Sequence, residues 1–198
     1  MSDTQALIKE LGLQQHPAGG TVSSIVAIKR SLTVAPRCRW KVAFQGSKKE
    51  AENDTCTDAA PRALATTIYY LLTKESPTGI ILREKSVAYH MHHQGRMEYT
   101  LITSIPGQPP KIEKKVLGPE NRLIVVEPGV WKFARLLPED LKDEEKAKQG
   151  CLMTMLLVPG FSLDDHEFLT KETLEELFKG VEGGEEKIKE FEAHVWKN

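Results

Sequence analysis

The sequence lacks the features that mark a membrane span, a disulfide framework or a nucleic-acid-binding surface. Among its 198 residues there is no apolar run long enough to span a bilayer. The three cysteines are an odd number without CxxC spacing, which argues against a disulfide framework and against a zinc knuckle. Lysine and arginine number 27 against 28 aspartate and glutamate residues, so no charge excess favours a nucleic-acid partner. The N-terminal segment has no apolar signal-peptide core, and we therefore expect a cytoplasmic protein that binds neither nucleic acid nor membrane.

Short strand-like segments recur along the chain and are separated by turns rich in glycine and proline. The predicted strands cover residues 21–28, 31–44, 65–72, 88–93, 97–103, 111–117, 123–126, 130–137 and 151–158. We expect the two segments beside Gln94-Gly95-Arg96 to pair as a hairpin. A short helix is predicted over 3–13 and two amphipathic helices after Thr170, while 45–61 is expected to be a surface loop that could act as a lid. This pattern favours an antiparallel sandwich or barrel.

Three of the six histidines lie in one stretch, at positions 90, 92 and 93. Because side chains alternate along a strand, His90 and His92 share one face, whereas Tyr89, Met91 and His93 share the other. One of these two sets faces the interior if the strand lines a pocket. A β-bulge beside the turn could bring His92 or His93 to the pocket mouth.

Four motifs, in order, resemble the eukaryotic branch of the DUF985 family of cupins. They are LIKELGLQQHPAGG, TTIYYLLTKESPTG, VVEPGVWKFARLLP and LVPGFSLDDHEF, the last of which ends at Phe168. The resemblance as a whole runs from about Leu7 to about Phe178. The resemblance implies a mainly-β fold, a double-stranded β-helix or jelly-roll barrel, with a short N-terminal helix and C-terminal helices. It also implies a pocket inside the barrel and a homodimer. We expect the barrel to occupy residues 1–178 and a helical tail to occupy 179–198.

The positions that carry polar pocket groups in the family are largely apolar in this chain. The family register puts Leu82, Val87 and Met155 at such positions, and Lys132 at another. It turns Tyr89 and Met91 inward and makes His90 a structural histidine rather than a catalytic one. Buried among apolar side chains, Lys132 would act in acid–base chemistry or as an anchor, unless its ammonium group extends to the rim. Asp164, Asp165 and His166 are interpreted as part of a structural loop.

These considerations predict a catalytic set and a substrate-binding set. The catalytic set is Tyr89, His92 and Lys132, and the substrate-binding set is Leu82, Val87, His90, Met91, Glu98, Ala134 and Met155. A cupin metal site gathers about three histidines and a carboxylate from several strands. Leu82 and Val87 cannot supply ligands, so no metal or other cofactor is predicted.

The resulting hypothesis is a metal-independent cupin enzyme that binds a small, largely apolar carbonyl or phenolic compound. Its reaction would be an acid–base isomerisation, cyclisation, epimerisation or dehydration, for example in secondary metabolism. An apolar barrel interior with a few convergent polar groups is the usual pattern of such a site. Two alternatives stay open: a non-catalytic small-molecule-binding cupin, and a metal-dependent oxygenase or isomerase that uses His90, His92 and Glu98.

Overall fold

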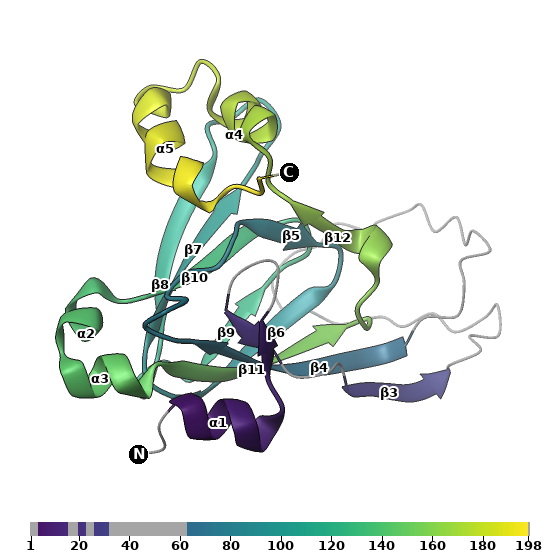
Figure 1. Ribbon diagram of the computed structural model, residues 1–198. Helices are drawn as coiled ribbons and strands as arrows, with labels where there is room; N and C mark the ends of the chain where they lie inside the picture. The colour runs from purple at the N-terminus through teal and green to yellow at the C-terminus, as the bar shows by residue number, and fades with distance from the viewer. Residues whose placement is uncertain (1–3, 16–19, 23–25, 32–62, 198) are drawn as a thin grey trace.

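Two antiparallel β-sheets face each other in the computed structural model, which describes residues 4–15, 20–22, 26–31 and 63–197 (Figure 1). The seven-stranded sheet has the order β1-β2-β4-β11-β6-β9, with β3 beside β4. Its strands are β1 (Gln14–Gln15), β2 (Thr21–Val22), β3 (Val26–Ser31), β4 (Ala63–Leu72), β6 (Val87–Gln94), β9 (Leu123–Val126) and β11 (Cys151–Val158). The five-stranded sheet has the order β12-β5-β10-β7-β8. Its strands are β5 (Leu82–Glu84), β7 (Met97–Thr103), β8 (Lys111–Leu117), β10 (Trp131–Leu136) and β12 (His166–Phe168).

The expected mainly-β fold is confirmed, and so are most of the predicted strands. β8, β9 and β11 have the predicted bounds, and β4 begins two residues earlier than predicted. Over the described residues the two sheets share no strand, so the jelly roll is an open sandwich rather than a closed barrel. Most of the predicted strand over 31–44 and the whole predicted loop over 45–61 lie outside the described residues.

The predicted hairpin around Gly95 is wrong. β6 pairs with β9 and β11 in the seven-stranded sheet, whereas β7 pairs with β8 and β10 in the five-stranded sheet. The chain crosses between the sheets at Gly95, which has a φ of 69°. A Cβ added there would lie 1.8 Å from the carbonyl oxygen of Gly150, so only glycine fits. Alternation of side chains identified both strands but could not identify their partners.

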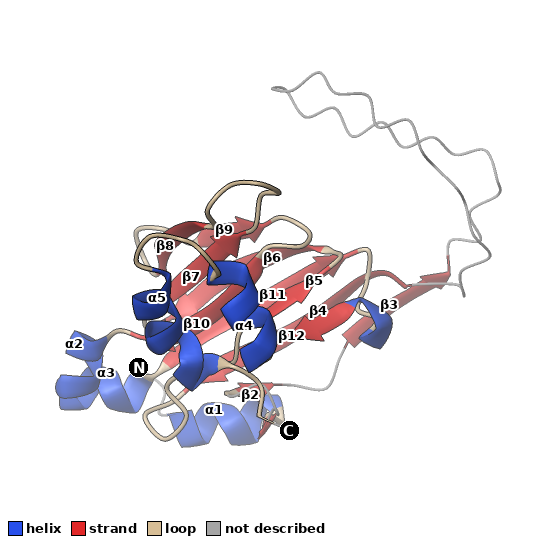
Figure 2. Ribbon diagram, turned by 90° about the horizontal axis from the view of Figure 1, so that it is seen from above, coloured by secondary structure: helices blue, strands red, loops and turns tan. Residues whose placement is uncertain are grey.

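The helices lie outside the sandwich formed by the two sheets (Figure 2). They are α1 (Thr4–Leu11), α2 (Pro138–Lys142), α3 (Glu144–Gln149), α4 (Lys171–Phe178) and α5 (Gly184–Phe191), with 3-10 turns η1 (Leu163–Asp165) and η2 (Glu192–His194). Leu7 of α1 packs with Leu71 of β4 and Leu152 of β11. None of the described helices is long and apolar enough to cross a membrane.

The C-terminal helices pack against the five-stranded sheet. Phe178 of α4 and Phe191 of α5 share one buried cluster with Trp131 and Phe133 of β10. Full burial of a side chain of this size contributes about 2 kcal/mol relative to exposure. The boundary expected between 178 and 179 falls inside this cluster, and the division into barrel and tail stays a prediction.

Candidate active site

A cavity of about 190 Å³ lies between the two sheets. Most of its wall is apolar, with contributions from Ile68, Leu82, Met153, Met155, Leu157 and Phe161. Its polar side chains include Tyr70, Glu84, His90, Tyr99, Lys132 and His166. An apolar cavity of roughly 150 Å³ can hold benzene, so this cavity suits a compound with a single ring. Such an apolar space with a few polar groups is typical of a small-molecule site.

The register of the seven-stranded sheet turns His90 toward the cavity. Met155 of β11 lies directly opposite both Ile68 of β4 and His90 of β6, and His90 lies opposite Ile124 of β9. Residues directly opposite each other in antiparallel strands project to the same face. Ile68, Met155 and His90 all line the cavity, and their neighbours along each strand therefore face outward.

The His90 imidazole is buried and neutral. It is 1% exposed, and its Nδ1 lies 2.8 Å from the Tyr99 hydroxyl of β7 and 3.4 Å from Sδ of Met153. Loss of hydration, together with the nearby Lys132 charge, lowers the pKa of His90 from 6.5 to about 3. Burial also raises the pKa of Tyr99 well above its usual value, so its hydroxyl keeps its proton. Nε2 of His90 has no hydrogen-bond partner among the described residues.

Three strands of the five-stranded sheet bring Glu84, Lys132 and His166 together. Nζ of Lys132 (β10) lies 2.5 Å from Oε2 of Glu84 (β5), and both side chains are nearly fully buried. Nδ1 of His166 (β12) lies 3.3 Å from Oε1 of Glu84, without the alignment of a hydrogen bond. Burial on its own raises the pKa of Glu84, but His166 and Lys132 outweigh this effect and hold the pKa at about 2. Glu84 is therefore a carboxylate, and Lys132 forms an ion pair inside the cavity instead of extending to the rim.

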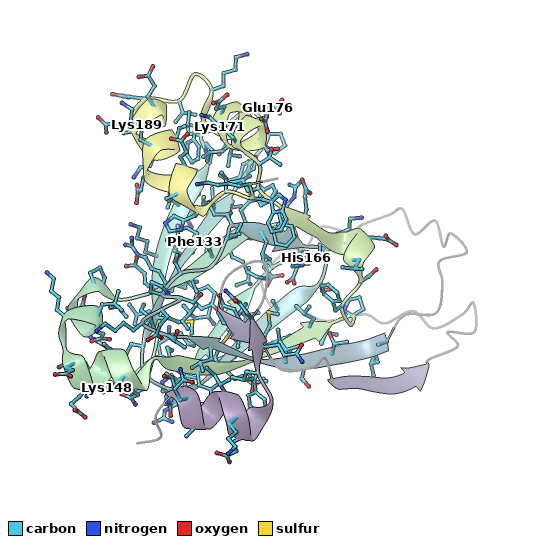
Figure 3. The ribbon with its side chains drawn as sticks, viewed as in Figure 1. Phe133, Lys148, His166, Lys171, Glu176 and Lys189 are labelled. Carbon is cyan, nitrogen blue, oxygen red and sulfur yellow. The ribbon has the colours of Figure 1, made fainter. Side chains whose placement is uncertain are left out.

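Figure 3 shows where this part of the molecule lies relative to its charged surface. His166 and Phe133 lie in the middle of the molecule on the side of the five-stranded sheet. Lys171, Glu176 and Lys189 lie on the C-terminal helices, away from these two residues. His166, which lines the cavity, is thus separate from the charges on the C-terminal helices.

The cavity contains half of the residues predicted for the site. Leu82, His90, Lys132, Ala134 and Met155 line it. Tyr89, Val87, Met91, His92 and Glu98 do not line it. The catalytic and binding roles of the first group stay predictions.

The predicted inward orientation of Tyr89 and Met91 is wrong. Both residues flank His90 on β6, and His90 occupies the inner face. The family register placed Met155 and Tyr89 on the same face, but the observed pairing of Met155 with His90 makes that arrangement impossible. Val87 lies on the same outer face as Tyr89, and the Glu98 carboxylate accepts hydrogen bonds from Arg135 instead of facing the cavity.

A β-bulge lies beside the turn, yet it brings neither neighbouring histidine into the cavity. The pairing of β11 with β6 shifts between Leu152 and Met153, which lie opposite Gln94 and His92. Nε2 of His92 lies 2.8 Å from the carbonyl oxygen of Gly95, to which it donates. Nε2 of His93 lies 2.7 Å from the Thr154 hydroxyl. His92 thus stabilises the turn and His93 joins β6 to β11, and no cavity role follows for His92.

Sequence reasoning missed Glu84, Tyr99 and His166. Glu84 and His166 belong to β5 and β12, which have three residues each and are too short to show a period. The motif around His166 favours a structural loop, but this histidine lines the cavity. One available signal was Lys132, because a lysine at an inward position needs a carboxylate partner.

The described residues do not fit a cupin metal centre. Among them, no group of three or more histidine, cysteine or acidic side chains is placed to hold a metal ion. Of the proposed ligands, only His90 lines the cavity, and its Nδ1 already contacts Tyr99. The Glu84 carboxylate is already paired with Lys132.

Comparison with known proteins identifies the family. The profile of the cupin superfamily family Cupin_5 (DUF985) matches residues 5–169. The chain therefore belongs to the DUF985 family of cupins, as the four motifs indicated. YML079W, a Saccharomyces cerevisiae protein described as uncharacterized, is 34% identical over 119 residues. This match covers 59% of the chain and 56% of the yeast protein.

Two solved structures share the fold over nearly their whole length. A hypothetical protein from Leishmania major has a TM-score of 0.68 at 22% identity, with 99% of this chain and 100% of that chain covered. The protein SO0799 from Shewanella oneidensis has a TM-score of 0.65 at 18% identity, with 100% of both chains covered. At these identities the similarity establishes the fold alone. The reaction must be inferred from the geometry of the site.

Proposed function

We propose that this cupin is an enzyme that binds a small, largely apolar carbonyl or phenolic compound and catalyses proton transfer on it. The reaction would be an isomerisation, cyclisation, epimerisation or dehydration. One observation carries the proposal: the apolar cavity holds a buried neutral histidine from one sheet and a buried Glu84–Lys132 pair with His166 from the other. The apolar wall accommodates the ring of the ligand, and the polar groups act on its oxygen and on the adjacent carbon.

His166 is the candidate proton acceptor and donor. A carboxylate beside an imidazole nitrogen orients the ring and stabilises the imidazolium that forms when the ring takes a proton. Glu84 is placed for this role at 3.3 Å from Nδ1 of His166. Such contacts are often loose without substrate and tighten when it binds. Lys132 keeps Glu84 ionised and is a positioning residue in this scheme.

Enolisation is the shared first step of most of these reactions. The bond between hydrogen and the carbon next to the carbonyl breaks, and the proton moves to His166. The electron pair of that bond moves into the new carbon–carbon double bond. The π pair of the carbonyl group moves to its oxygen, which becomes the enolate oxygen. A hydrogen-bond donor at that oxygen lowers the barrier, because the negative charge develops there.

The test is exchange of the methyl protons of acetophenone with D2O, followed by proton NMR. We expect the protein to accelerate this exchange above the buffer rate, and we expect His166→Gln and Glu84→Gln to reduce the acceleration by about 100-fold or more. Glu167→Gln is the matched control, because Glu167 also lies on β12 but pairs with Arg83 at the surface. No acceleration with acetophenone, propiophenone or cyclohexanone would contradict the enzymatic proposal, and binding without exchange would favour a ligand-binding cupin.

The outer face of the seven-stranded sheet supports a homodimer as part of this proposal. Tyr69, Leu123 and Val125 are 37–50% exposed there, and Tyr89 and Met91 lie directly opposite Val125 and Leu123. A face made of neutral side chains can meet a second copy of itself without repulsion between like charges. Tyr89→Lys should convert the dimer to a monomer in light scattering, and a wild-type monomer would contradict this part.

We also place the protein in the cytoplasm. The buried Cys151 is a free thiol, as is usual in a reducing compartment. Cell fractionation with an antibody to the native protein tests this location. Recovery in the secreted or membrane fraction would contradict it.

A further inference from the structure

The hydroxyl of Tyr99 has one proton and two acceptors within reach. Nδ1 of His90 lies at 2.8 Å and Sδ of Met153 at 3.4 Å. A thioether sulfur is a weak acceptor, whereas the lone pair of a neutral imidazole is a strong one. Donation of the Tyr99 proton to Nδ1 of His90 is therefore the stronger of the two hydrogen bonds open to this hydroxyl. All three side chains are buried, so bulk water does not compete for this proton.

A neutral imidazole carries its proton on one nitrogen and a lone pair on the other. If Nδ1 accepts from Tyr99, the proton of His90 must reside on Nε2. Lys132 acts electrostatically on His90 and Glu84 offsets this effect only in part, but Nζ of Lys132 donates its hydrogen bond to Glu84 and none to Nε2 of His90. The ammonium group thus does not force a lone pair onto Nε2.

We propose that Tyr99 fixes His90 as the Nε2–H tautomer, so that the cavity presents a hydrogen-bond donor to the carbonyl oxygen of its ligand. Nε2 has no hydrogen-bond partner among the residues that the structure describes, and because almost none of its surface is exposed, a ligand oxygen reaches it only with a shift of neighbouring side chains. A buried donor without a partner is unfavourable, and a ligand oxygen that accepts this bond removes that cost. The same bond strengthens as negative charge develops on the oxygen during enolisation.

This inference narrows the ligand to a neutral compound with a single ring and a carbonyl oxygen. The ligand part rests on the proposed function, whereas the tautomer does not. His90 then acts as a hydrogen-bond donor to the reacting oxygen, and the base must be another group. Tyr99 is a positioning residue that acts through His90.

The tautomer can be read directly from nitrogen NMR of protein labelled with 15N-histidine near pH 7. We expect His90 to show a protonated Nε2 and an unprotonated Nδ1, with its signals assigned by their loss in His90→Phe. In Tyr99→Phe the two shifts should move toward each other, because the hydroxyl no longer selects one tautomer. A wild-type His90 protonated on Nδ1 would overturn the inference.

The ligand class can be tested with two isosteric probes, acetophenone and α-methylstyrene, which differ in a C=O and a C=CH2 group. The wild-type protein should bind acetophenone about fivefold to tenfold more tightly, as expected for one hydrogen bond. In His90→Phe the two probes should bind equally, and in Glu167→Gln the preference should stay unchanged. Equal affinity in the wild type, or binding of neither probe, would overturn the ligand assignment.

The two sets of measurements separate this inference from the proposed function. The predicted tautomer with no catalysed proton exchange would refute the enzymatic proposal and leave the inference on His90 standing. Catalysed exchange by a protein whose His90 is protonated on Nδ1 would refute the inference on His90 and leave the enzymatic proposal standing.

Discussion

The cavity holds two polar clusters that respond to burial in opposite ways. The ion-pair cluster, Glu84, Lys132 and His166, keeps a carboxylate ionised because His166 and the Lys132 charge 2.5 Å away both lower its pKa. The histidine–tyrosine pair, His90 and Tyr99, has no carboxylate in contact among the described residues, and burial keeps His90 neutral. Burial of a titratable group thus gives a charged or a neutral group according to its neighbours. One cavity thereby combines a charged wall with a neutral donor.

The largest expected effect comes from breaking the ion-pair cluster. Lys132→Met leaves the Glu84 carboxylate buried without its counter-charge and should lower the free energy of unfolding by about 3–5 kcal/mol in urea denaturation. The double variant Lys132→Met/Glu84→Leu removes both charges and should recover most of this loss. If the double variant is as unstable as the single one, packing rather than charge explains the effect.

The second expected effect is a pH dependence caused by His90. Its pKa is about 3 in the folded protein and 6.5 in the unfolded chain, so only the unfolded chain takes up the proton as the pH falls below 6.5. Its contribution to stability is complete above pH 6.5 and should decline by up to about 1.4 kcal/mol per pH unit toward pH 3. Glu84, with a pKa of about 2 against 4.5, adds a loss only below pH 4.5.

Urea denaturation between about pH 7 and pH 5 measures this slope. His93 and His194, whose pKa values are also lowered by burial, contribute to the same window. His90→Phe should remove the part of the slope that corresponds to one proton. An unchanged slope in His90→Phe would show that His90 is not the group responsible.

A smaller effect is expected from Tyr99→Phe. This change leaves Nδ1 of His90 without the hydroxyl at 2.8 Å and should cost about 1–3 kcal/mol of stability, because a buried polar atom loses its partner. Thermal and urea unfolding both report this loss. A variant as stable as the wild type would indicate that the hydrogen bond is not made in solution.

The smallest effect is expected at the surface next to the ion-pair cluster. Glu167 pairs with Arg83 at 2.7 Å, but both side chains are well exposed. Glu167→Gln should change the stability by less than about 1 kcal/mol at neutral pH. A larger loss, measured by the same urea titration, would contradict the view that the exposed carboxylate of Glu167 contributes much less to stability than the buried carboxylate of Glu84.

Much of the fold could be predicted because the long strands carry a clear period. β8, β9 and β11 have the predicted bounds, and the family motifs identified the jelly roll. The three-residue strands β5 and β12 could not be predicted, and they bring Glu84 and His166 into the cavity. The face of β6 could not be decided either, since a shift of one residue exchanges Tyr89 for His90.

The sequence by itself determined the family, the mainly-β architecture, the inward position of Lys132 and the apolar character of the cavity. Those properties depend on local alternation and on motifs that are continuous in the chain. The tertiary structure alone decided that Lys132 meets Glu84, that Tyr99 meets His90, and that Gly95 carries the chain between the sheets. These contacts join residues distant in sequence or depend on which strands pair, and strand pairing is fixed by the packing of the whole sandwich.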